Sequence, residues 1–325
     1  MGCPAGIGPE ILLKFLHGRS GNPAFRPLIL GDIGVLHRVG QDLGLEIDLR
    51  PWEPGMALPS RGVPVYSLSS LDPSLLEWGQ PTRETGRAMA EYILEAVRLC
   101  QEQTLAAMVT CPIGKATLNA AGFPYPGHTE MLAELTGCDH YRMMMAGSRL
   151  RVVLVTIHEP LARVGDLLAP ESIADCIRMT HQALEQDFGI TGPRIAVAGF
   201  NPHCGEQGMF GREEIDIIEP AVRRLASSCR VSGPWPPDTV FHQAAEGRFD
   251  AVVAMYHDQG LIPFKLLHFR DGVNVTLGLP IVRTSVDHGT AYDIAGRNLA
   301  DPASLAAAWE LAARIGANRA RRTAP

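Results

Sequence analysis

The chain has 325 residues, of which 46% are apolar and 20% charged, and its formal net charge is −6. Such a composition is typical of a globular protein with one large domain or two of medium size. The acidic balance and the absence of a long Lys/Arg run argue against nucleic acid as a partner. No apolar run reaches the roughly 18 residues that span a bilayer, which argues against a membrane protein.

The N-terminal residues and the cysteines indicate where the protein is expected to be located. The first residues are rich in glycine and proline, so we expect no signal peptide. The seven cysteines are odd in number and include no CxxC pair, which argues against a disulfide framework or a zinc ribbon. We therefore expect a reducing, cytoplasmic location.

Short β-branched apolar runs alternate along the chain with segments of helical periodicity, in which residues such as Met89, Ile93 and Val97 share one face. This alternation predicts an α/β layered fold with a largely parallel sheet. We predict strands at 27–30, 63–67, 105–110, 152–156, 194–198, 251–255 and 273–277. We predict helices at 9–16, 33–43, 85–103, 129–136, 171–188, 213–227 and 302–319. Loops are expected at 51–64 and 232–237.

The chain opens with a glycine-rich turn, 2–8, that leads into the first predicted helix. Such turns normally follow a strand, and no strand is predicted before this one. The turn is compatible with an anion-binding loop, although a purely structural tight turn is the more frequent case.

Three histidines follow predicted strands: His158 in Ile-His-Glu-Pro, His203 in Asn-Pro-His-Cys-Gly-Glu and His257 in Tyr-His-Asp-Gln-Gly. A single histidine at a strand end is more often structural than a ligand. Three imidazoles at strand ends suit a catalytic divalent metal with positions left open for substrate. Cys204 is a rival to His203 as a ligand, and we favour the histidine because neighbours on an extended strand point to opposite faces.

A second group of polar residues suits an anionic substrate. His128 and Thr129 lie where a loop enters a helix, so they can line the positive helix end, although Thr129 is equally suited to be a simple N-cap. Lys265, Asn274 and Arg283 together suit a phosphate or carboxylate. The Gly/Asp-rich segment 285–296 is either a nucleotide pocket or a long structural turn.

These motifs, in this order, resemble the 4-hydroxythreonine-4-phosphate dehydrogenase family of vitamin B6 biosynthesis, together with its paralogues that act on four-carbon sugar-acid phosphates. The resemblance covers essentially the whole chain, from Pro-Ala-Gly-Ile-Gly-Pro-Glu through Gly-His-Thr-Glu to Thr-Ser-Val-Asp-His-Gly-Thr-Ala. It implies a two-domain α/β/α fold like that of isocitrate and isopropylmalate dehydrogenases, with the active-site cleft between the domains. We expect one domain from 1–120 plus 285–325 on the cofactor side, and another from 121–284 on the metal and dimer side.

The resemblance also implies the roles of single residues. His158, His203 and His257 would bind the metal, one of them across the interface of a homodimer with a shared active site. His128, Thr129, Lys265, Asn274 and Arg283 would bind the phosphorylated substrate. Lys265 and Asp258 are the catalytic candidates. Lys265, or a nearby histidine, would relay the proton, and Asp258 would support the metal ligand. His288 and Asp293 would contact the cofactor, NAD or else NADP.

Two departures from the family pattern stand out. Cys3 occupies a position where relatives usually have aspartate, and Gly114 one where asparagine or histidine is common. The match at the neighbouring Lys115 is therefore looser, and Lys115 is a secondary site candidate.

The expected reaction is metal-dependent oxidation of a secondary hydroxyl by NAD, followed by decarboxylation of the β-keto acid. The sequence does not choose among zinc, cobalt, nickel, manganese and magnesium. NAD is favoured over NADP because Arg297 is the one basic residue near the expected adenosine loop. Alternative substrates are D-threonate or D-erythronate 4-phosphate, or a cyclic dihydrodiol dicarboxylate. A metal-dependent phosphate-ester hydrolase or a phosphate-ligand binding protein is the alternative from another class.

Overall fold

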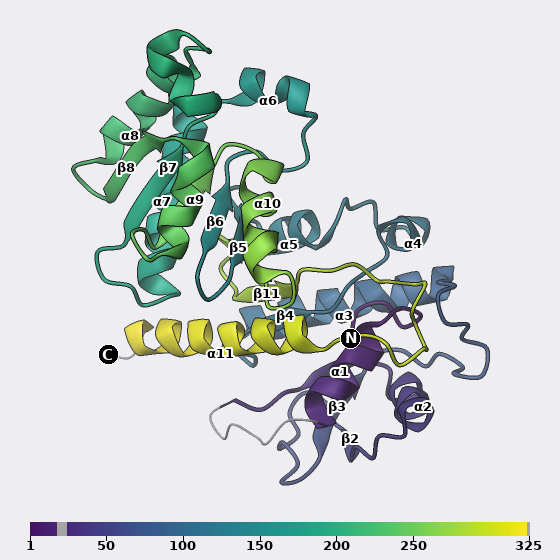
Figure 1. Cartoon of the computed structure of the whole chain (residues 1–325). Coiled ribbons are helices and arrows are strands. Elements are labelled where there is room, and N and C mark those ends of the chain that lie inside the picture. Colours follow the sequence, from purple (N-terminus) through teal and green to yellow (C-terminus); the bar gives the residue numbers. More distant parts are fainter. Residues whose placement is uncertain (18–24, 324–325) are drawn as a thin grey trace. The chain divides into compact units, whose positions relative to one another are not determined.

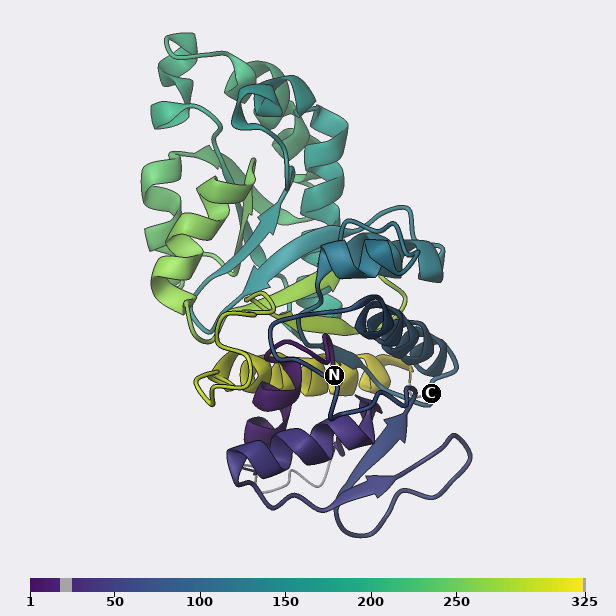
Figure 2. The ribbon, with the colours of Figure 1, turned by 90° about the vertical axis from the view of Figure 1, so that its right-hand side faces the viewer.

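The protein forms two compact units in the computed structural model, which describes residues 1–17 and 25–323 (Figures 1 and 2). Unit 1 comprises Met1–Asp139 and Pro280–Ala313, and unit 2 comprises His140–Leu279 and Arg314–Pro325. The domain boundaries expected from the sequence differ from these units in residues 121–139, 280–284 and 314–325, and they stay a prediction.

Unit 1 contains two sets of parallel strands with helices packed against them. Its helices are α1 (Gly8–His17), α2 (Ile33–Leu43), α3 (Arg83–Gln101), α4 (Lys115–Ala120), α5 (His128–Thr136) and the first half of α11 (Ala303–Thr323). Its strands are β1 (Ile29–Gly31), β2 (Leu49–Pro51), β3 (Val63–Ser67), β4 (Met108–Thr110) and β11 (Arg283–Val286). β3 lies between β1 and β2, and β4 pairs with β11.

Local sequence explains where the unit 1 helices begin. Asp32 caps α2 by accepting a hydrogen bond of 3.0 Å from the amide of Val35. Thr82 and Thr85 form a capping box at the start of α3. The buried face of α3 includes Met89 and Ile93, as the helical periodicity predicted.

Unit 2 is a mixed sheet between helices. Its strands are β5 (Arg142–Ala146), β6 (Arg151–Leu154), β7 (Arg194–Ala198), β8 (Arg230–Trp235), β9 (Ala251–Ala254) and β10 (Val273–Leu277), in the order β10-β5-β6-β9-β7-β8. β6, β9, β7 and β8 are parallel, whereas β5 is antiparallel to both of its neighbours. Its helical segments are α6 (Leu161–Leu167), α7 (Pro170–Gln186), η1 (Pro202–Gly208), η2 (Glu214–Ile218), α8 (Glu219–Leu225), α9 (Pro237–Ala245) and α10 (His257–His268).

Helices cover both faces of this sheet. In Figure 2 the green helices α9 and α10 lie to the left of the strands and the teal helix α7 to the right. Phe241 of α9 and Phe264 of α10 pack with alternate residues of β6, β9 and β7, the residues that share one face of the sheet. Because both faces are covered, the central strands β6, β7 and β9 are almost wholly buried.

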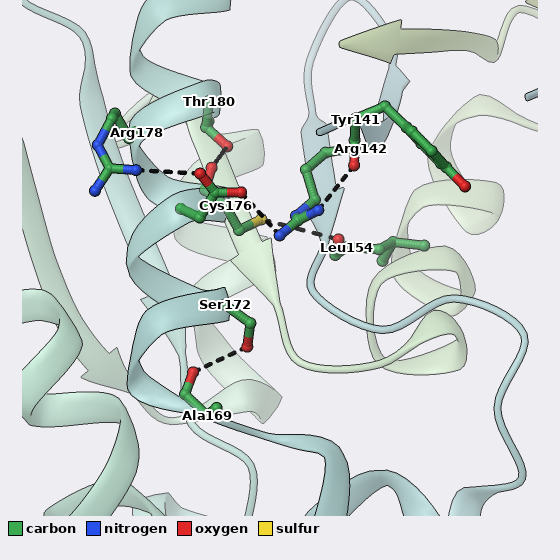
Figure 3. Close-up of polar contacts among 9 residues, drawn as sticks. Tyr141, Arg142, Leu154, Ala169, Ser172, Cys176, Arg178 and Thr180 are labelled. Atoms are coloured by element: carbon green, nitrogen blue, oxygen red, sulfur yellow. Dashed lines mark hydrogen bonds and ion pairs between the residues drawn. The ribbon is translucent and has the colours of Figure 1, made fainter. Parts of the chain in front are cut away.

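Polar contacts attach α7 to the neighbouring strands (Figure 3). Arg142 of β5 donates a hydrogen bond of 3.0 Å to Asp175, which also pairs with Arg178 one turn further along α7. The thiol of Cys176 faces the carbonyl of Leu154 at 3.8 Å. Burial of Cys176 raises the pKa of its thiol to about 12, so this cysteine is a structural residue.

The predicted α/β fold is confirmed, and most predicted elements lie within a few residues of the observed ones. The expected loop at 232–237 is wrong, because residues 232–235 belong to β8. β8 is an edge strand, where a proline such as Pro234 can lie without removing a needed ladder bond. Several elements were not predicted: β2, β5, β11, α4, α6, α9 and α10. No helix in the described ranges has the length and hydropathy of a membrane span.

Candidate active site

The ends of three adjacent parallel strands bring the predicted histidine motifs to one edge of the unit 2 sheet. β9 lies between β6 and β7, and the carboxyl ends of parallel strands share an edge. His158 follows β6, His203 follows β7, and His257 is the first residue of α10, which follows β9. The edge is thus shared by all three motifs.

His158 and His257 form a close pair. Their ring centroids are 5.7 Å apart, with an angle of 40° between the ring planes. Two imidazoles bound to one zinc ion at about 2.1 Å from each nitrogen have ring centres roughly 5 Å apart, so the observed spacing is compatible with a shared ion.

Asp258 orients one member of this pair. Its Oδ1 lies 2.7 Å from Nδ1 of His257, and a carboxylate at that position holds the proton on Nδ1. Nε2 of His257 is then left with its lone pair for a ligand. The expected role of Asp258, support of a metal ligand, stays a prediction.

His203 lies in a different environment. Its side chain is 65% exposed, and its Nδ1 contacts Oε1 of Glu206 at 3.3 Å. Residues 203–207 all have positive φ, so η1 is a left-handed turn. This turn sets the backbone direction at His203. Within 1–17 and 25–323, no three His, Cys, Asp or Glu side chains gather closely enough for a metal ion. The chain by itself therefore brings together two of the three predicted ligands.

Hydrogen bonds between the motifs fix the positions of the loops at this edge of the sheet. Gln259 accepts a bond of 2.7 Å from the amide of Met255 and donates one of 2.6 Å to the carbonyl of Gly199. It thus ties the start of α10 to the end of β7. The hydroxyl of Thr156 donates to the carbonyl of Met255 at 2.8 Å and ties the loop of His158 to β9.

Glu214 is a positioning residue that the sequence analysis missed. It is buried, and its Oε1 accepts hydrogen bonds of 2.7 Å from the amides of both Phe200 and Asn201. Its Oε2 accepts a bond from the side chain of Asn201 at 3.0 Å. The sequence gives little signal for this role, because Glu214 lies among other acidic residues of a segment predicted to be helical.

A second cluster lies in unit 1, at the start of α5. The N-cap of this helix is Gly127 and not Thr129, because Thr129 is already the second helical residue. Gly127 has no side chain to bond the amides of the first turn. The positive end of the helix is therefore available to an anion beside His128 and Thr129.

Arg283 supplies a buried cation to the same unit. Its guanidinium is almost inaccessible to solvent and donates to Oγ1 of Thr110 at 3.0 and 3.2 Å. Burial lowers the pKa of Arg283 to about 10. Desolvation, with the nearby charges of Arg283 and Lys115, holds the pKa of His128 well below its usual range. His128 is therefore a neutral imidazole in a cationic surrounding.

The two other predicted substrate ligands belong to unit 2. Lys265 lies two turns after His257 on α10. Asn274 lies on β10, opposite Met145 of β5. The Oδ1 of Asn274 is buried and has no hydrogen-bond partner among the residues that the structure describes, which suits a side chain that awaits a ligand.

The predicted cofactor segment is a loop between β11 and α11. Nδ1 of His288 contacts the carbonyl of Gly289 at 3.1 Å, and its buried Nε2 has no partner in the described part of the chain. Asp293 is exposed. The loop packs against the first glycine-rich turn, where the amide of Ile7 donates to the carbonyl of Thr290 at 3.1 Å.

Cys3 and Gly114, the two expected departures from the family pattern, both lie close to the side chain of Tyr292 in this loop. The hydroxyl of Tyr292 donates to the thiol of Cys3 at 3.4 Å. The same hydroxyl lies where a side chain at Gly114 would begin. Tyr292 therefore fills space that larger residues at these two positions would need.

Comparison with known proteins gives consistent matches over nearly the whole chain. Residues 24–312 match the family model described as pyridoxal phosphate biosynthetic protein PdxA. A curated relative from Desulfosudis oleivorans, named 4-hydroxythreonine-4-phosphate dehydrogenase, is 54% identical over 320 residues, which cover 96% of this chain and 93% of the relative. A relative of the same name from Geobacter metallireducens is 51% identical over 97% of this chain and 94% of its own length.

Solved structures agree with the sequence matches. A 4-hydroxythreonine-4-phosphate dehydrogenase from Klebsiella pneumoniae is 43% identical, with a TM-score of 0.88 over 97% of this chain and 98% of that one. A terephthalate 1,2-cis-dihydrodiol dehydrogenase from Burkholderia xenovorans is 32% identical, with a TM-score of 0.67 over 96% of each chain.

Proposed function

The chain belongs to the family of the pyridoxal phosphate biosynthetic protein PdxA, and from that membership we propose that it oxidises 4-hydroxythreonine 4-phosphate with NAD and a divalent metal. The oxidised product, a β-keto acid, then loses carbon dioxide. The lower identity and TM-score of the dihydrodiol dehydrogenase favour the phosphorylated substrate over a cyclic diol.

The cationic cluster of unit 1 is the observation that best supports a phosphorylated substrate. The buried guanidinium of Arg283, the amides of the first turn of α5 and the side chain of Thr129 suit the oxygens of a phosphate group. Neutral His128 can donate a hydrogen bond to the same group without a charge of its own. The amide of Asn274 and the ammonium of Lys265 would contact other polar groups of the substrate.

The histidine pair of unit 2 fits a divalent metal in part. His158 and His257 would supply two nitrogen ligands, and Asp258 would hold the proton on the far nitrogen of His257. His203 would complete the set from the second subunit of a homodimer. When bound, such an ion acts as a Lewis acid on the substrate hydroxyl. Zinc, cobalt, nickel, manganese and magnesium all stay candidates.

Lys265 and the loop 287–293 complete the proposed machinery. Lys265 lies on the same helix as His257 and would receive and pass on the proton of the reacting hydroxyl. His288, whose Nε2 is buried, and Asp293 would bind the cofactor. NAD, which accepts the hydride, is preferred to NADP because Arg297 is the one cation among residues 287–297.

Exposed apolar side chains on α10 support a homodimer. Ile262 and Leu266 of α10 are 68% and 85% exposed, and Phe269, the C-cap residue of this helix, is 80% exposed. Their spacing places them along one side of the helix. A contiguous apolar surface of this kind marks an interface. α10 begins with His257, so a partner subunit on this helix would lie beside the histidine pair.

The proposal is tested by following NADH formation by the purified, metal-loaded protein with three substrates in parallel. They are 4-hydroxythreonine 4-phosphate, D-threonate 4-phosphate and D-erythronate 4-phosphate. We expect turnover with the first. Preference for either sugar-acid phosphate would replace the proposed substrate, and phosphate release without NADH would indicate a hydrolase.

The metal assignment has its own test. We expect His257→Ala to lose bound metal, measured by elemental analysis, together with NADH formation, while its circular dichroism spectrum is unchanged. His37→Ala, on the exposed side of α2, is the matched control and should keep both. Full metal content in His257→Ala would overturn the assignment.

A further inference from the structure

The loop between β11 and α11 contains a strained backbone position that the proposed reaction does not explain. Ala291 has a φ of 42°, in the left-handed region that residues other than glycine rarely adopt. Strain of this kind persists only where surrounding contacts fix the chain, and it is frequent at ligand sites. The contacts on either side of Ala291 must therefore hold it in place.

The residue before Ala291 is held by the first glycine-rich turn. The carbonyl of Thr290 accepts a hydrogen bond of 3.1 Å from the amide of Ile7. A side chain at Gly6 would begin 3.1 Å from the same carbonyl, so the turn passes close to it. The carbonyl of Ala291 accepts a further bond of 3.1 Å from the amide of Ile294. Backbone contacts thus fix this side of the strained residue.

The residue after Ala291 is held through its side chain. The hydroxyl of Tyr292 donates to the thiol of Cys3 at 3.4 Å. Burial and the bond to Cys3 raise the pKa of Tyr292, and the neighbouring hydroxyls of Thr290 and Thr117 offset only part of this rise. The tyrosine therefore keeps its proton and remains a hydrogen-bond donor. One hydroxyl connects the loop to the first turn and to α4, which contains Thr117.

Two glycines leave the space in which Tyr292 fits. A side chain at Gly114, the N-cap of α4, would meet the Tyr292 hydroxyl. A side chain at Gly79 would begin 2.5 Å from the carbonyl of Tyr292, and the amide of Gly79 donates to the carbonyl of Ala5 at 2.8 Å. The position of Tyr292 is therefore set by three segments that lie far apart in the sequence.

The strained residue lies between the two proposed cofactor ligands. His288 comes three residues before Ala291, and its buried Nε2 has no hydrogen-bond partner among the residues that the structure describes. Asp293 comes two residues after Ala291 and is exposed. A rotation of the backbone at Ala291 would move one of these side chains relative to the other. The strain therefore bears directly on how the loop presents them.

We propose that Tyr292 is a positioning residue for the cofactor: its hydroxyl holds the loop 287–293 in the strained conformation that presents His288 and Asp293 together to NAD. The identity of the ligand rests on the proposed function, whereas the anchoring of the loop does not. A loop that adopts its binding conformation for a smaller fraction of the time binds more weakly in proportion. Loss of the hydroxyl therefore weakens NAD binding although Tyr292 itself need not touch NAD.

Three variants of the full-length protein test this role. Tyr292→Phe keeps the ring and removes the hydroxyl. The double variant Tyr292→Phe/Ala291→Gly also removes the strain, because glycine adopts a positive φ freely. Tyr66→Phe is the matched control, since it removes a hydroxyl of β3 that lies near Glu95 of α3.

Hydrogen exchange of the proteins without ligand tests the anchoring. We expect the amides of 288–296 to exchange about three- to tenfold faster in Tyr292→Phe than in the parent protein, the effect of one lost hydrogen bond. Exchange should slow again in the double variant and stay at the parent rate in Tyr66→Phe. Equal exchange in the parent and in Tyr292→Phe would overturn the proposal, as would a double variant that exchanges as fast as Tyr292→Phe.

Titration calorimetry with NAD tests what the anchoring does. We expect the Kd for NAD to rise about three- to tenfold in Tyr292→Phe and to recover in the double variant. The KM for 4-hydroxythreonine 4-phosphate and kcat at saturating NAD should change by less than about twofold, because the tyrosine acts on the cofactor loop alone. Equal losses of affinity for substrate and NAD would indicate a general loss of structure and would count against the positioning role. A parent protein that binds no NAD would overturn the proposed cofactor, and the exchange rates would still decide whether Tyr292 anchors the loop.

Discussion

At the scale of single residues, close tertiary contacts explain why certain amino acids occupy positions that the apolar pattern of the sequence does not account for. Gly260 is the last residue of the Tyr-His-Asp-Gln-Gly motif on α10, and a methyl group there would lie 2.5 Å from the side chain of Val152. The absence of a side chain lets α10 pack tightly on β6 and so places His257 near His158. Gln259 and Glu214 act similarly, because their buried polar groups fix the loops that carry the histidines.

The Tyr292 hydroxyl gives a test of this kind of packing. We expect Gly114→Ala to lower the free energy of unfolding by about 1–3 kcal/mol, because the new methyl group meets that hydroxyl. In the Tyr292→Phe background the nearest ring atom would be the ordinary 3.5 Å away, so the same substitution should cost much less. Urea denaturation of the two single variants and the double variant measures the coupling. Additive losses would show that the two positions do not share this space.

His128 gives a pH-dependent prediction. Its pKa is lowered in the folded protein, so the unfolded chain binds the proton more readily below its ordinary pKa of about 6.5. The stability associated with neutral His128 is thus present above about pH 6.5 and is lost as the pH falls, by at most about 1.4 kcal/mol per pH unit. His128→Gln should make the free energy of unfolding less dependent on pH between 7 and 5. Parallel curves for the two proteins would contradict this.

At the scale of secondary-structure elements, the C-terminal ends of α2 and α3 have the same backbone geometry, but only α2 has the glycine that this geometry favours. α2 ends at Gly44, whose φ of 65° is the left-handed conformation that glycine adopts without strain. α3 ends with the same geometry, but the left-handed position is occupied by Gln103, with a φ of 59°. The amide of Thr104 bonds back to the carbonyl of Leu99 at 2.9 Å, which completes the motif.

This exception predicts a stabilising substitution. Gln103→Gly should raise the free energy of unfolding by about 0.5–1 kcal/mol, because glycine removes the strain of a left-handed side chain. Gly44→Ala is the matched reverse change and should lower stability by a similar amount; no atom lies within 4 Å of the added methyl group. Thermal or urea denaturation measures both. A loss of stability in Gln103→Gly would mean that the glutamine side chain contributes more than the strain costs.

At the scale of the whole molecule, the apolar side of α10 predicts the state of assembly. Leu266→Glu should convert the proposed dimer to a monomer, because a carboxylate would be buried in the interface without a partner. Leu75→Glu is the control, since Leu75 is 79% exposed in unit 1 and should leave the mass unchanged. Analytical ultracentrifugation gives the mass and circular dichroism the fold. A monomeric parent protein, or a dimeric Leu266→Glu, would count against the interface.

Much of the architecture follows from the sequence alone. Period-two and period-3.6 apolar patterns arise from the geometry of single elements, so β3, β7, β10 and α2 could be located without tertiary information. The strand-end positions of the three histidine motifs were predictable for the same reason. The helices that connect β6, β7 and β9 make these three strands parallel and bring their carboxyl ends to one edge.

The tertiary structure decided what depends on contacts between distant residues. α10 contains Gly260 and Pro263, which oppose a helix locally, and it forms because its buried face packs on β6 and β9. Contacts between residues far apart in sequence produce the pairing of His158 with His257 and the burial of Arg283. The left-handed turn of η1 separates His203 from that pair. Apolar periodicity carries no information about such contacts, because they are set by how whole elements pack and not by the residues adjacent in the chain.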